Sequence, residues 1–172
     1  MLALIGISLS ACGGDDERSP GGPAAADARA LCKQNSDAED TASVNAVTTY
    51  AVGPWARSAA EGQRVTAAYL TLCNSGTAPI VLTGAASPIA VAAEIHQTTT
   101  DADGVARMTL APPLTIAPGD GLRLSPGGPH VMLIGLAAPL APGAVAPFTL
   151  SFEDGTTLAV EAPARAIAGA SN

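Results

Sequence analysis

Short apolar segments separated by turn residues fill the chain from about residue 43 onward. A strand that buries one face places apolar side chains at every second position. In residues 64–73, Leu70 and Leu72 share one face of such a strand, whereas Tyr69 and Cys73 share the other. The predicted strands cover residues 44–52, 64–73, 78–82, 89–97, 104–110, 121–124, 130–136, 148–152 and 157–162.

This pattern predicts an all-β domain. Asp154-Gly155, between two alternating segments, is a strong hairpin signal. The 14 prolines and 18 glycines leave little room for long helices. Many short strands at close spacing are typical of a Greek-key β-sandwich or barrel.

The N-terminal residues differ in character from this domain. Residues 1–10 form a short apolar run that ends in Leu9-Ser10-Ala11-Cys12, and a membrane-spanning helix would need roughly 20 residues. The ending resembles the lipobox of bacterial lipoproteins, in which cleavage before the cysteine leaves it as the lipidated first residue. The alternative is an ordinary export signal with a chance cysteine. Either way we expect an exported protein.

Four regions follow from this interpretation. Residues 1–11 are a signal peptide, and residues 12–42 are the lipidated Cys12 and a flexible tether with at most a helical turn at residues 28–33. Residues 43–166 are the β-sandwich, and residues 167–172 are a tail. The expected location is the periplasm, with the protein lipid-anchored to a bacterial membrane.

Export determines how the cysteines are interpreted. With Cys12 lipidated, Cys32 and Cys73 remain to pair in an oxidising compartment. The pair would close a loop of about 40 residues and contribute about 3–4 kcal/mol of stability under the chain-entropy model. The alternative is two separate thiols.

The net charge of −7 argues against one class of partner. An acidic surface repels phosphate backbones and anionic lipid headgroups, so we expect no nucleic-acid binding and membrane contact only through the lipid.

Both histidines and two of the three methionines lie between residues 96 and 132. His96 and Met108 flank the turn at residues 101–104 and are equidistant from Ala102, which predicts that they are cross-strand neighbours. His130 and Met132 are two residues apart on a strand, so their side chains share a face.

Two imidazoles and two thioethers form a soft donor set. Thioethers bind calcium and magnesium poorly and are uncommon in zinc sites, whereas copper(I) accepts them readily. We therefore predict a copper(I) site at His96, Met108, His130 and Met132. A neutral set without thiolate suits delivery of copper rather than storage.

The spacing of these ligands resembles the motif of a known family. Other similar segments are Pro54-Trp55-Ala56-Arg57, residues 67–71, Ser87-Pro88, Ser125-Pro126-Gly127-Gly128-Pro129 and Phe152-Glu153-Asp154-Gly155. Together they resemble the periplasmic copper chaperones called the copper A chaperone, or PCuAC-like, family. The resemblance implies a cupredoxin-like fold, the same four ligands, and delivery of copper to an acceptor such as a cytochrome oxidase subunit during copper A assembly.

Two other function classes remain as alternatives. A cupredoxin-type electron-transfer protein would need a cysteine thiolate beside two histidines. A metal-free structural or interaction lipoprotein would use the four residues for packing. We do not expect an enzyme, since no nucleophile–base arrangement can be read from the sequence. Glu94 lies on the same face of its predicted strand as His96. We interpret it as a solvated carboxylate, or as a group that supports a metal ligand, rather than as a general base.

Overall fold

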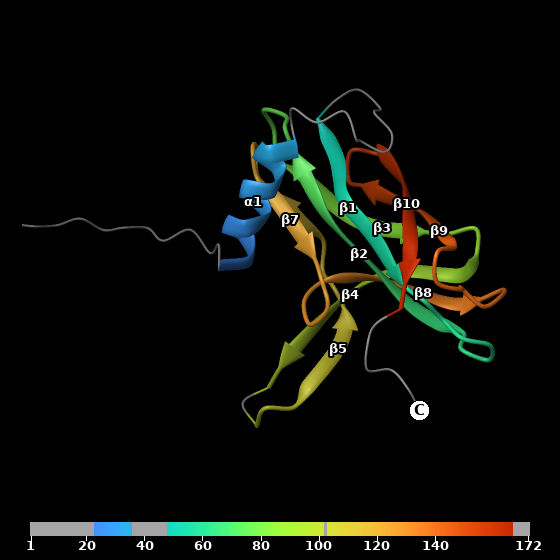
Figure 1. Cartoon of the computed structure of the whole chain (residues 1–172). Coiled ribbons are helices and arrows are strands. Elements are labelled where there is room, and N and C mark those ends of the chain that lie inside the picture. The colour runs from blue at the N-terminus through green and yellow to red at the C-terminus, as the bar shows by residue number, and fades with distance from the viewer. Residues whose placement is uncertain (1–22, 36–47, 102, 167–172) are drawn as a thin grey trace, which may run out of the picture.

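A computed structural model describes residues 23–35, 48–101 and 103–166 of the chain. The predicted lipidation site at Cys12, the signal peptide and the predicted tail lie outside these residues. These residues form one helix followed by ten strands, and Figure 1 shows how they are arranged. The elements are α1 (Pro23–Asn35), β1 (Thr49–Arg57), β2 (Val65–Asn74), β3 (Ile80–Ala86), β4 (Ala90–Thr100), β5 (Ala106–Leu110), β6 (Leu114–Ile116), β7 (Gly121–Leu124), β8 (His130–Leu136), β9 (Val145–Phe152) and β10 (Thr157–Arg165).

The strands form one sheet that closes on itself. Its order is β5-β4-β8-β2-β1-β10-β9-β3-β6, and β7 pairs with β2. An additional pairing of β3 with β4, at Ala85 and Ala93, closes a seven-stranded barrel. The β1–β10 pair is parallel, and the other pairs are antiparallel. The prediction of an all-β domain is confirmed.

Side chains at alternate positions of the strands point inward and fill the barrel. In β10, buried and exposed residues follow one another strictly, and β9 buries every second residue. Each strand therefore contributes one apolar face to a common core. Large side chains with almost no exposure include Phe148, Leu72, Leu82, Leu124, Leu133, Leu150, Val131 and Val160.

The predicted hairpin at Asp154-Gly155 joins β9 to β10. Gly155 has a φ of 81°, which a residue with a Cβ rarely adopts. The Asp154 carboxylate accepts hydrogen bonds from the hydroxyl and the backbone N–H of Thr156, and these bonds lower the pKa of Asp154. The sequence pattern missed β6, which has three residues.

Helix α1 lies where the sequence predicts a tether, so that prediction was wrong for residues 23–35. The segment is rich in alanine and begins with proline at the first helical position, both of which favour a helix. A short isolated helix is marginal in water. Contacts with the barrel therefore explain its presence.

Several contacts hold α1 against β2 and β7, next to which it lies in Figure 1. A disulfide joins Cys32 to Cys73, with Cα atoms 5.6 Å apart. Arg29 donates two hydrogen bonds of 3.2 Å to the carboxylate of Asp120. A Cβ on Gly121 would lie 2.7 Å from Cys32 Sγ, so only glycine lets the helix approach this closely.

The described part of the chain contains no helix that is long and apolar enough to cross a membrane.

We predict that the Cys32–Cys73 disulfide forms in the exported protein and stabilises it. In the full chain with Cys12→Ser, thiol titration of denatured, unreduced protein should find no free thiol, and two after reduction. Reduction should lower the free energy of unfolding by about 3–4 kcal/mol, because the loop of 41 residues is then no longer closed in the unfolded chain. Two reactive thiols before reduction would contradict the pairing.

Candidate metal centre

The two histidines lie opposite one another on neighbouring strands. β4 pairs antiparallel with β8 so that His96 faces His130, and their ring centroids are 6.3 Å apart. Bonds from imidazole nitrogen to a metal are roughly 2 Å long. The separation therefore leaves room for one ion between the two rings.

Met132 lies on the same face of β8 as His130. Val131 and Leu133 are fully buried in the core, so His130 and Met132, which alternate with them, face outward from the barrel. Met132 lies between Glu94 of β4 and Ala67 of β2 in the register. The prediction that His130 and Met132 share a face is confirmed.

The predicted direct pairing of His96 with Met108 was wrong. His96 lies opposite Leu110, whereas Met108 lies opposite Thr98. The prediction centred the hairpin on Ala102, but Asp101 and Val105 close the turn, which is therefore centred on residue 103. Met108 is thus a diagonal neighbour of His96 on the same face, a position from which long side chains still reach each other.

Met108, His130 and Met132 line one cavity of about 330 Å³. His130 forms its wall, with only 4% of its surface exposed, whereas Met108 is 51% exposed on the edge strand β5. His96 is not among the lining residues but contacts the ring of His130 from the neighbouring strand. The structure therefore gathers the four predicted ligands at one outer face of the barrel.

A backbone hydrogen bond orients His130. Its Nδ1 lies 2.9 Å from the carbonyl oxygen of Gly128. A carbonyl only accepts, so Nδ1 carries the proton and Nε2 keeps a lone pair. Metal-binding histidines are commonly fixed in this way.

Aromatic side chains shield one side of His130. The ring of Tyr69 lies 6.1 Å from that of His130, and the ring of Trp55 lies 4.4 Å from that of Tyr69. Burial raises the pKa of Tyr69, and the nearby charge of Arg57 opposes this only in part. The phenol therefore stays neutral at physiological pH and serves as a wall rather than as an anionic ligand.

The nitrogens of His96 have different surroundings. Nε2 lies 2.7 Å from Glu94 Oε2, whereas Nδ1 is buried without a hydrogen-bond partner. A buried polar atom without a partner is uncommon in folded proteins. A bound metal ion would supply the missing partner, so this nitrogen fits a role as ligand.

The donor types at the site favour a soft ion. Within the described residues, no group of three or more His, Cys, Asp or Glu side chains is placed to hold a metal. Both cysteines of this part of the chain form the disulfide. Any metal here would depend on imidazole and thioether donors, which suit neither calcium nor a typical zinc site.

Sequence reasoning did not identify the groups that support His130. The carbonyl of Gly128 carries no sequence signal, because any residue has one. The sequence did contain a signal for Tyr69, because this residue alternates along β2 with the residues of the apolar face. The hydrogen bond between Glu94 and His96 agrees with one of the two interpretations given to that carboxylate.

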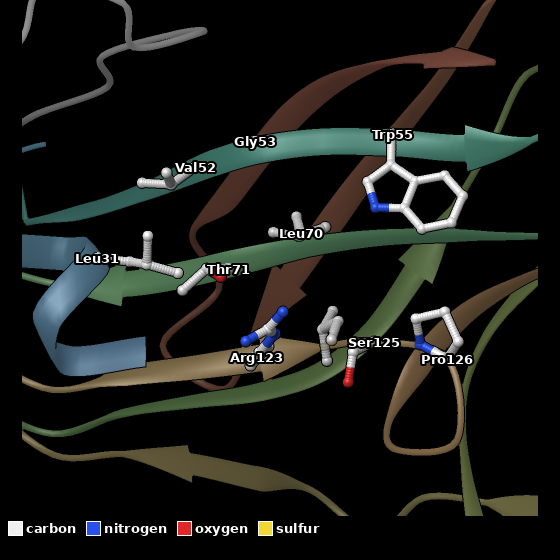
Figure 2. Close-up of a pocket in the computed structure, with 10 residues that line it drawn as sticks. Leu31, Val52, Gly53, Trp55, Leu70, Thr71, Arg123, Ser125 and Pro126 are labelled. Carbon is white, nitrogen blue, oxygen red and sulfur yellow. The ribbon is translucent and has the colours of Figure 1, made fainter. Parts of the chain in front are cut away.

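A second cavity, of about 250 Å³, lies near α1, β1, β2 and β7, and Figure 2 shows the residues that line it. Leu31 lies at one end, and Trp55 and Pro126 lie at the other. None of its lining residues carries an imidazole, thioether or thiol group. Pro126 lines both cavities, so the turn before β8 lies between them. The second cavity is not a soft-metal site.

Comparisons with known proteins identify relatives of this chain. Residues 50–164 match the family model described as "Putative lipoprotein LpqE-like". A relative named "Putative lipoprotein Lxx21020", from Leifsonia xyli subsp. xyli, is 35% identical over 116 residues, which are 67% of this chain and 69% of that protein.

Similar solved structures include a PCuAC domain and the protein DR1885. The apo PCuAC domain of PmoF1 has a TM-score of 0.61 at 24% identity, over 74% of this chain and 99% of that domain. DR1885 from Deinococcus radiodurans in its copper(I) form has a TM-score of 0.53 at 37% identity, over 75% of this chain and 83% of that one. Its apo form is 33% identical, with a TM-score of 0.56, over 95% of this chain and 98% of that one.

The likeness to these domains confirms the predicted cupredoxin-like fold and the resemblance on which it was based. The chain belongs to the LpqE-like lipoprotein family, built on the β-barrel of PCuAC domains.

Proposed function

We propose that this protein is a copper(I) chaperone that works outside the cytoplasm, anchored by lipid on Cys12 to a bacterial membrane. Copper(I) is its cargo, held by His96, Met108, His130 and Met132. The observation that carries the proposal is the sheet register, which gathers two imidazoles and two thioethers on one outer face of the barrel. The copper(I) form of DR1885, at 37% identity, supports the same chemistry for this chain.

The proposed delivery step follows from differences in exposure. The exposed Met108 sits on an edge strand, where an acceptor reaches it without opening the barrel. The donors carry no negative charge, so copper(I) is released without protonation of a thiolate. The proposed acceptor is a copper protein such as a cytochrome oxidase subunit, during copper A assembly in the periplasm.

Electron transfer on the same fold is disfavoured by the cysteines. A blue-copper site needs a cysteine thiolate as a ligand. Cys32 and Cys73 are joined to each other under α1, and neither lines the cavity that holds the methionines.

We predict one copper(I) per protein, bound with the help of both thioethers. Loss of a residue that only orients a metal ligand typically lowers metal affinity 10–100-fold. Met108 and Met132 are proposed as ligands themselves, so the double variant Met108→Leu, Met132→Leu should lower copper(I) affinity by about 100-fold or more. Leucine has a similar size, and the fold should be kept. Anaerobic titration against a copper(I) probe measures the change.

Val65→Ala is the matched control, because Val65 lines the same cavity without supplying a donor. It should leave the copper(I) affinity nearly unchanged. Wild-type affinity in the double methionine variant would remove the thioethers from the site.

We also predict that the mature protein begins at a lipidated Cys12. Intact-mass measurement of protein extracted from membranes should show loss of residues 1–11 and addition of lipid. Cys12→Ala should abolish the lipid and release the protein from the membrane fraction. A mature protein that retains residues 1–11 would be incompatible with this part of the proposal.

A further inference from the structure

The hydrogen bonds of the two histidines differ in a way that assigns their donor atoms. In His130, Nδ1 is bonded to the carbonyl oxygen of Gly128, which leaves Nε2 for a metal. In His96 the arrangement is reversed, because Nε2 is bonded to Glu94 at 2.7 Å and Nδ1 has no partner. The two imidazoles therefore make these hydrogen bonds through opposite ring nitrogens, Nδ1 in His130 and Nε2 in His96.

The strand register explains why Glu94 reaches His96. The two residues alternate on β4 and so share its outer face. Glu94 lies opposite Met132, and His96 lies opposite His130. The carboxylate is therefore part of the same surface as the four candidate ligands.

The proton of His96 belongs on Nε2. A carboxylate accepts and does not donate, so the nitrogen next to it carries hydrogen. A second proton on Nδ1 would place a buried N–H where no acceptor lies. The neutral ring with hydrogen on Nε2 satisfies both conditions and leaves the buried Nδ1 with its lone pair.

The exposure of Glu94 fits the role of a partner to His96. Its side chain is 42% exposed, whereas that of His96 is 16% exposed. A hydrated carboxylate is a hard donor, which copper(I) does not favour over thioether and imidazole. Its negative charge also compensates the positive charge of a monovalent ion held by four neutral donors.

We propose that Glu94 is a positioning residue that holds His96 in the tautomer with hydrogen on Nε2. His96 then binds copper(I) through Nδ1, while His130 binds it through Nε2. This inference rests on the copper(I) function proposed above and adds the donor atoms and the residue that selects one of them.

Long-range ¹H–¹⁵N NMR spectra of the imidazoles test the assignment, since copper(I) is diamagnetic. In the full chain with Cys12→Ser and without metal, Nε2 of His96 and Nδ1 of His130 should give signals of protonated nitrogen. One equivalent of copper(I) should shift the signals of the other two nitrogens. A protonated Nδ1 in metal-free His96, or a copper-induced loss of its Nε2 proton, would overturn the assignment.

Variants of Glu94 test its role separately. Glu94→Ala should allow both tautomers of His96 and weaken copper(I) binding by about 10–100-fold, as for other partners of metal ligands. Glu94→Gln keeps an oxygen that accepts from Nε2–H but adds an amide group that donates to a bare Nε2. Its tautomer ratio and copper(I) affinity should therefore fall between those of the wild type and Glu94→Ala. Glu161→Ala removes a carboxylate at an exposed position of β10. It should change neither the tautomer of His96 nor the copper(I) affinity.

Two outcomes separate this inference from the copper proposal. A single Nε2–H tautomer in Glu94→Ala, with unchanged affinity, would overturn the role of Glu94 while copper binding stood. Absence of copper(I) binding in the unsubstituted site would overturn the proposed function and the donor-atom assignment. The tautomer of the metal-free protein would still decide whether Glu94 orients His96.

Discussion

The antiparallel register between β4 and β8 determines where the candidate ligands lie. Ile95 of β4 pairs with Val131 of β8, and both are buried in the core. A slip of one residue would move these side chains outward and bring His130 into the barrel. Apolar packing on the inner face therefore sets the position of His96 against His130 on the outer face, without any polar contact between them.

The sequence predicted which candidate ligands lie on the outer face better than it predicted which residues are direct neighbours there. Strict alternation around Val131 placed His130 and Met132 together, because a strand repeats every two residues. The hairpin of β4 and β5 was predicted two residues out of register, since Gly104, with a φ of 80°, belongs to a turn centred on residue 103. A shift of two residues preserves the face, so Met108 still lies on the side of the histidines.

Helix α1 was missed because its stability depends on the folded barrel. Its alanines and Pro23 favour a helix, but an isolated helix of this length is marginal in water. The sequence does not show that Arg29 would meet Asp120 or that Gly121 would leave room for the helix. The two cysteines were the one signal that linked this segment to β2. The disulfide that they form also removes both thiols from metal chemistry.

The candidate ligands His130 and Met108 differ most in their surroundings. His130 is buried, hydrogen-bonded to Gly128 and flanked by Tyr69, so its nitrogen is held in place before any ion binds. Met108 lies at the exposed edge of the sheet and has three rotatable bonds. In a copper chaperone this difference has a direct consequence. Under the proposed function, the fixed imidazole of His130 would retain the ion, while the flexible thioether of Met108 at the open edge would be the donor that an incoming acceptor displaces first.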